Sequence, residues 1–118
     1  MPHSNLITRL SEWGNHLRVM TMAREVAMHA PKAMAQQPIA FFNASARITG
    51  LSQNAAFSLL ASWGLRLAGI PVYHFVCRHG MSRCVLGTNR DNFHKAPPCM
   101  SCIRQSKRLH LGADTYSV

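Results

Sequence analysis

The sequence predicts an α/β fold in which an N-terminal helix precedes a strand, a long helix and a second strand of a parallel sheet. Apolar runs at residues 39–42 and 70–77 are typical of buried strands, and a helical pattern over residues 52–68 separates them. A helix between two strands is the usual crossover connection of a parallel sheet. The 118 residues, 47% of them hydrophobic, are enough for one compact domain.

Residues 6–30 are predicted to form an amphipathic helix, because apolar residues recur at alternating spacings of four and three. Pro31 marks its end, since proline disfavours a helical conformation of the preceding residue. We expect the stripe to pack against the core, and a partner surface or an anionic bilayer are the alternatives. Residues 1–37 thus form the N-terminal amphipathic helix region. The stripe consists of Leu6, Leu10, Trp13, Leu17, Met20, Ala23, Ala27 and Ala30.

The strand predicted at residues 39–42 is apolar without interruption, which is typical of a strand buried on both faces. The following helix has a thin polar stripe of Asn54, Ser58, Ser62 and Arg66 and is otherwise apolar, so we expect it to be mostly buried. Both strands are too apolar for an edge position. The parallel sheet is therefore expected to be incomplete, as in a fragment of a longer protein.

Gly69 follows the predicted helix where a left-handed C-terminal cap belongs. Pro71 lies at the start of the next strand, where the missing backbone donor matters least. After this strand the sequence predicts a cysteine-rich loop that leads into a further helix.

The full chain has 13 Lys and Arg residues against 4 Asp and Glu, a net charge of +9. This positive charge is concentrated in the second half of the chain. Residues 78–108 contain seven basic residues and one aspartate, a net +6. Such a field attracts nucleic acid, an anionic membrane surface or the diphosphate of an activated sugar or lipid. A solvated basic face is the alternative, and charge does not choose among them.

Membrane-spanning and secretory segments are not predicted. No stretch approaches the roughly 20 consecutive apolar residues that a spanning helix needs, and charged residues interrupt the first 30 residues. We therefore expect a cytoplasmic protein, peripheral to the membrane if it binds one. In that reducing compartment, cysteines are more naturally thiols or metal ligands than disulfides.

The four cysteines, Cys77, Cys84, Cys99 and Cys102, carry the clearest chemical signal. A C-x2-C step at the start of a helix lets two thiolates converge on one ion, and four thiolates are a usual ligand set for structural zinc. The first pair is spaced more widely than in ordinary zinc ribbons. A labile disulfide pairing and unligated buried thiols therefore remain as alternatives to zinc.

Catalytic motifs are absent from the sequence. It contains no nucleophile elbow, phosphate-binding glycine loop, HExxH motif or pair of carboxylates suited to general acid–base catalysis. No catalytic residue is assigned, and this chain alone is not expected to be a complete enzyme.

Three segments together resemble the N-terminal half of bacterial glycosyltransferases of the two-Rossmann (GT-B) type, especially those of capsule and surface polysaccharides. They are PIAFFNASARITG at 38–50, LAGIPVYHFVC at 67–77, and the cysteine segments GMSRCVLGT at 80–88 and PPCMSC at 97–102. The resemblance implies a partial Rossmann-like domain over 38–118 with a cysteine-rich insertion at 77–102.

In that family the N-terminal domain receives the acceptor, and the nucleotide-sugar is held mostly by a C-terminal domain. The resemblance therefore implies an acceptor-side role with a lipid or polysaccharide acceptor. By position, the residues lining the interdomain cleft would be Asn43, Ser45, Arg47, Thr49 and Gly50. The alternative is that Asn43 and Ser45 only form the turn and cap the next helix.

Two other classes of function compete with this interpretation. The first is a small zinc-stabilised nucleic-acid-binding module, which rests on the basic stretch and the cysteines. Against it, Phe93 is the only aromatic residue between Arg78 and His110, so a stacking platform is missing. The second is a non-catalytic interaction domain that forms a homo-oligomer to complete its sheet.

Overall fold

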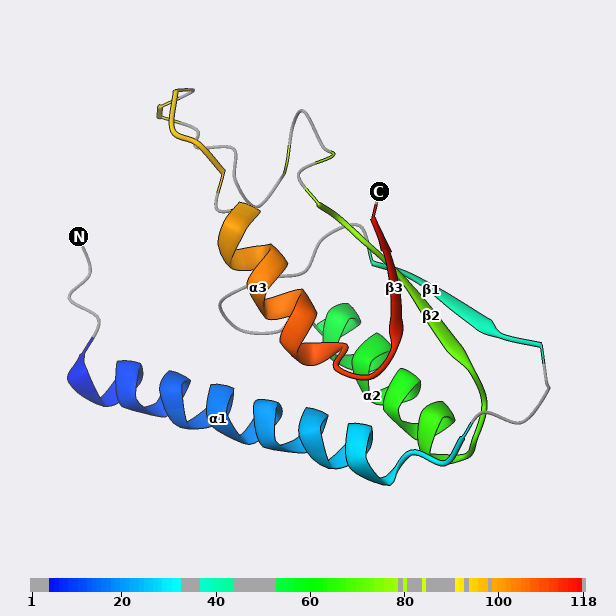
Figure 1. Ribbon diagram of the computed structural model, residues 1–118. Helices are drawn as coiled ribbons and strands as arrows, with labels where there is room; N and C mark the ends of the chain where they lie inside the picture. Colours follow the sequence, from blue (N-terminus) through cyan, green and yellow to red (C-terminus); the bar gives the residue numbers. More distant parts are fainter. Residues whose placement is uncertain are drawn as a thin grey trace.

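The computed structural model describes residues 5–32, 37–43, 53–78, 80, 84, 91–92, 94–97 and 99–117. Helices and strands alternate along this part of the chain (Figure 1). They are α1 (Leu6–His29), β1 (Ile39–Asn43), α2 (Gln53–Leu67), β2 (Val72–Val76), α3 (Cys99–Leu109) and β3 (Asp114–Ser117). The two predicted long helices and the two predicted strands are confirmed to within one or two residues at each end.

The three strands form one small parallel sheet in the order β1-β2-β3. Ile39 pairs with Val72, and Tyr73 pairs with Asp114. Since α2 connects β1 to β2 and α3 lies between β2 and β3, the strand–helix–strand unit occurs twice. The sequence predicts only the first of these units, because the four residues of β3 are polar or exposed and contain no apolar run.

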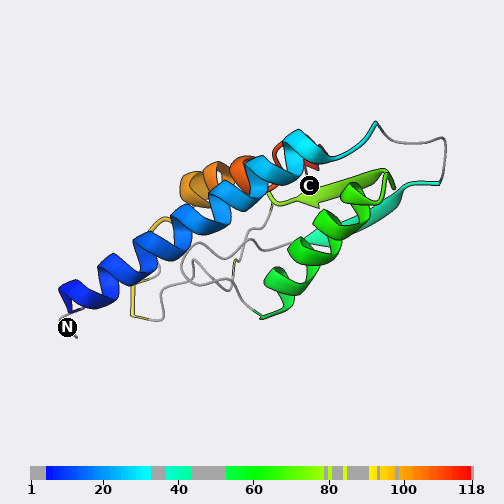
Figure 2. The same ribbon diagram turned by 90° about the horizontal axis from the view of Figure 1, so that it is seen from below.

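All three helices lie on one side of the sheet (Figures 1 and 2). On β2, Val72 and His74 are buried because they face these helices, whereas Tyr73 and Phe75 point to the other side and are half-buried. The chain is thus a mixed α/β structure of two layers. The apolar core lies where the three helices meet and consists of Ala23, Val26, Leu59, Trp63 and Leu109.

The other face of the sheet is an aromatic surface. Phe42, Phe75 and Tyr116 occupy one register position across the three strands. Their ring centroids are 6.3 Å apart from Phe42 to Phe75 and 5.5 Å apart from Phe75 to Tyr116. Phe42 is 66% exposed. The expectation that β1 is buried on both faces and away from an edge is therefore wrong, because in the described sheet β1 is an edge strand covered by helices on one side.

Only the C-terminal half of α1 packs against the body of the molecule. Ala23 is fully buried, whereas Leu6 and Trp13 are 76% and 64% exposed. The prediction that the apolar stripe packs against the core is confirmed only from about Val19 onward. The reason is length: α1 has 24 residues, while α2 and α3 have 15 and 11, so its N-terminal half extends past them (Figure 1).

The polar stripe of α2 turns inward at Ser62 and Arg66, which are both buried. The Ser62 hydroxyl donates to the Leu59 carbonyl at 2.7 Å, and Arg66 Nη2 donates to the Leu111 carbonyl at 2.8 Å. Phe57, by contrast, is 74% exposed. The expectation of a mostly buried apolar helix is wrong at such positions. Arg66 lies inside because the Leu111 carbonyl accepts its hydrogen bond there, and Ser62 can be buried because its own helix satisfies its hydroxyl.

Candidate functional site

Three of the four cysteines lie where the parallel strands end. Cys77 directly follows β2, and Cys99 and Cys102 begin α3. An interval of three residues places Cys99 and Cys102 on the same side of the helix. All four cysteines, including Cys84, are half-buried and form no disulfide. The carboxyl edge of the sheet therefore presents reduced sulfur side chains.

The thiols influence one another electrostatically. Burial raises the pKa of the Cys102 thiol, and the thiols of Cys84, Cys99 and Cys77 raise it further. An ionised thiolate nearby disfavours ionisation of the next one, and this effect acts only over short distances. The other three cysteines are thus close enough to Cys102 to influence its ionisation, although the four span 26 positions of the sequence, from 77 to 102.

These residues fit a zinc site by their chemistry. Zinc takes four thiolates in tetrahedral coordination, and a divalent cation would offset the repulsion among thiolates that adds to the effect of burial on the Cys102 pKa. Across the described ranges, no three His, Cys, Asp or Glu side chains are already gathered to hold a metal ion. Zinc binding by Cys77, Cys84, Cys99 and Cys102 therefore stays a prediction.

Asn43 ends β1 and pairs with Val76, the residue before Cys77, so the predicted cleft residue and the cysteines belong to one edge of the sheet. Ser45, Arg47, Thr49 and Gly50, also predicted to line a cleft, lie outside the described residues. A cavity of about 50 Å³ opens beside Cys77, Ile103, Ser106, Lys107 and Thr115. Small-molecule sites occupy roughly 300–1,000 Å³, so this hollow holds at most part of a ligand.

A buried polar cluster lies further inside, between the sheet and the helices. The rings of His74 and His110 stack with centroids 3.9 Å apart, and Phe41 lies against His74 at 5.7 Å. His74 is fully buried, and neither of its ring nitrogens has a hydrogen-bond partner. Arg66 is 7% exposed and uses Nη2 for its bond to Leu111, while its Nη1 has no partner.

Burial keeps both histidines neutral. It lowers the pKa of His74 to about 4, with a smaller contribution from the Arg66 charge. It lowers the pKa of His110 to about 3, and His74 and Arg66 contribute further. A general base near pH 7 needs a pKa near that pH and access to a substrate proton. The cluster offers neither, so we assign it no catalytic role.

None of these three residues is predicted to be functional from the sequence. One signal was present: the polar stripe that ends in Arg66 lies on an otherwise apolar helix, and His74 interrupts an apolar strand. Periodicity could not predict that His110 contacts His74, because His110 lies in the turn after α3. Only the tertiary structure joins these three positions.

Comparisons with protein-family models, with curated proteins and with solved structures give no match to this chain. The described helices also include none with the length and apolar character to cross a membrane. Function is therefore inferred from the chemistry and placement of the residues themselves.

Proposed function

We propose that this chain is the acceptor-side part of a glycosyltransferase-like protein of surface polysaccharide biosynthesis, with a structural zinc centre at the ligand-binding edge of its sheet. The observation that carries the proposal is the position of Cys77, Cys99 and Cys102 at the carboxyl ends of parallel strands. Ligands of open parallel α/β sheets bind beyond this edge. The sequence resemblance supplies the class of ligand.

Zinc would have a structural role in this proposal. Cys77 belongs to the segment that leaves β2, and Cys99 and Cys102 belong to the helix that leads into β3. A common ion would fasten the start of α3 to the end of β2 and thereby hold the carboxyl edge in one conformation. No catalytic residue is assigned to this chain.

Exposed cationic side chains provide attraction for phosphate groups at the same edge. Arg78 follows Cys77, and Arg104 and Lys107 project from α3. Lys107 and Arg78 also line the small cavity beside Cys77. These charges would favour the phosphates of a lipid-linked acceptor or a nucleotide-sugar and an anionic membrane surface.

The zinc centre is tested by elemental analysis and a free-thiol count on protein purified without chelator. We expect about one zinc per chain, with thiols released only by chelator or denaturant. Cys102→Ser is expected to lose the zinc, whereas Ser101→Ala, an exposed change in the same turn of α3, retains it. Metal-free wild-type protein with four freely reacting thiols would overturn the zinc centre.

The ligand class is tested by titrating the zinc-loaded protein with a short-chain prenyl phosphate, UDP-glucose and duplex DNA, followed by amide NMR. Saturable shifts near Asn43, Val76 and Cys77 with either of the first two ligands support the glycosyltransferase-like role. Tighter binding of DNA, falling steeply with salt, would instead identify a nucleic-acid-binding module. That outcome would leave the zinc result intact.

A further inference from the structure

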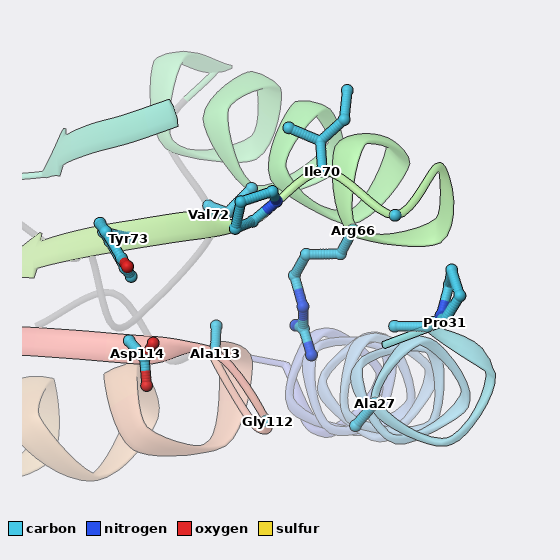
Figure 3. A pocket seen from close by; sticks show the side chains of 12 residues that line it. Ala27, Pro31, Arg66, Ile70, Val72, Tyr73, Gly112, Ala113 and Asp114 are labelled. Atoms are coloured by element: carbon cyan, nitrogen blue, oxygen red, sulfur yellow. The ribbon is translucent and has the colours of Figure 1, made fainter. Parts of the chain in front are cut away.

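A larger cavity lies at the opposite, amino edge of the sheet. It has a volume of about 310 Å³, opens to solvent and is bordered by the end of α1, the end of α2 and the starts of β2 and β3 (Figure 3). Ala27, Pro31, Val72 and Gly112 form part of its wall. The volume is at the lower limit for small-molecule sites, so it suits a metabolite rather than a polymer.

Arg66 is the only cationic side chain of this cavity wall among the described residues. It reaches from α2 towards Ala27 and Gly112 (Figure 3), and a methyl group added to Gly112 would lie 2.9 Å from Arg66 Nη2. Burial lowers the pKa of Arg66, and no described carboxylate lies within salt-bridge distance of it. A buried guanidinium without a counter-charge is costly, because its hydration is lost without compensation.

One hydrogen bond, from Nη2 to the Leu111 carbonyl, holds the guanidinium. Nη1 is buried and has no partner. A ligand oxygen in the cavity beside the guanidinium would supply the missing negative charge and a further hydrogen-bond acceptor. Guanidinium groups bind carboxylates and phosphates through such charge-assisted hydrogen bonds.

We propose that this cavity binds the oxyanion of a small metabolite, a carboxylate or a phosphate, with Arg66 as the residue that receives it. Asp114 also lines the cavity and is exposed. Its negative charge repels a bare anion, so it favours a ligand with hydroxyl or ammonium donors beside the oxyanion. The cysteines lie at the other end of the strands, so this site and the proposed zinc centre succeed or fail independently.

The test is an amide NMR titration of the full chain with inorganic phosphate and, separately, with acetate, at constant ionic strength maintained with sodium chloride. We expect saturable shifts of the amides around the cavity, at Gly69, Val72, Gly112 and Ala113. Arg66→Gln is expected to weaken the binding by about tenfold or more. Arg18→Gln, which removes an exposed cation from α1, is the matched control and keeps the wild-type affinity.

Asp114→Asn provides a second test that does not disturb a buried group. Removing its charge is expected to tighten phosphate binding by about two- to fivefold. A stronger response to phosphate than to acetate identifies a phosphorylated metabolite, and the reverse identifies a carboxylic acid. Absence of saturable shifts, shifts confined to residues 99–108, or an unchanged affinity in both folded variants would overturn the proposal.

Discussion

Acid should destabilise this fold through its two buried histidines. His74 and His110 have pKa values of about 4 and about 3 in the folded chain, against an ordinary value of 6.5. Below pH 6.5 the unfolded chain therefore binds protons that the folded chain does not bind. The free energy of unfolding falls as the pH falls from about 6.5 towards these folded-state values, and above pH 6.5 the two histidines have no effect on it.

The magnitude follows from the two shifts. Between pH 7.5 and pH 5, each histidine that stays neutral in the fold lowers the free energy of unfolding by about 2 kcal/mol, so the pair lowers it by about 4 kcal/mol. This is a large part of the roughly 5–15 kcal/mol that stabilises a typical domain. Arg66 of α2 is the charged group that faces both rings, and it adds to the effect of burial in each case.

The assay is urea unfolding followed by circular dichroism from pH 7.5 to pH 5, with EDTA present throughout so that acid release of a metal does not contribute. His74→Phe, which keeps an aromatic ring against Phe41, should remove about half of the pH dependence. His94→Gln changes an exposed histidine and serves as the control. If the free energy of unfolding of His74→Phe depends on pH as steeply as that of the wild type, His74 does not cause the loss of stability in acid.

Two further changes test the packing. Gly112→Ala should lower the free energy of unfolding by about 1–3 kcal/mol, because Gly112 has φ +76 and an added methyl group would lie 2.9 Å from Arg66 Nη2. The control is Gly14→Ala on α1, where the added methyl group meets open space. This change should stabilise the chain by up to about 1 kcal/mol. Urea unfolding checks both, and a stabilising Gly112→Ala would contradict the described turn. Val26→Ala should destabilise by about 1–3 kcal/mol because Val26 is 7% exposed, whereas Leu10→Ala, at a position 60% exposed, should change stability by less than about 0.5 kcal/mol. Equal losses in these two variants would mean that the N-terminal half of α1 is packed.

Local sequence patterns were sufficient for the elements whose signal is periodic. The run at residues 39–42, the helix over Gln53–Leu67 and the strand Val72–Val76 each have a pattern that spans the whole element. Gly69 also adopts the left-handed conformation expected of a helix cap, with φ 79. These features depend on neighbours in sequence, which periodicity describes directly.

Side-chain environments were harder to predict, because they depend on which elements meet. Trp13 and Val26 both belong to apolar positions of α1, yet only Val26 reaches α2 and α3. Arg66 would be placed on a solvated face by its charge, but the Leu111 carbonyl from the turn before β3 accepts its hydrogen bond inside the fold. Neither outcome follows from the spacing of residues within one helix.

The candidate sites differ in the same way. The cysteines were found from their spacing, because C-x2-C is a local motif, whereas the cavity around Arg66 combines α1, α2, β2 and β3. Its lining includes two glycines and three alanines whose types carry no chemical signal in a sequence. Sites of that kind are visible only after the elements have been assembled.

The Arg66 cavity and the histidine pair should also be linked through charge. Arg66 lowers the pKa of His74 and of His110 in addition to burial, so an anion that neutralises Arg66 should move both pKa values upward. Because burial is the larger cause, this upward shift is partial and acid still destabilises the fold. At equal ionic strength, the free energy of unfolding should fall less steeply with decreasing pH in phosphate than in chloride. Histidine NMR titrations in the two salts measure this directly. An unchanged His74 titration at a phosphate concentration that saturates the Gly112 shift would show that the anion does not reach Arg66.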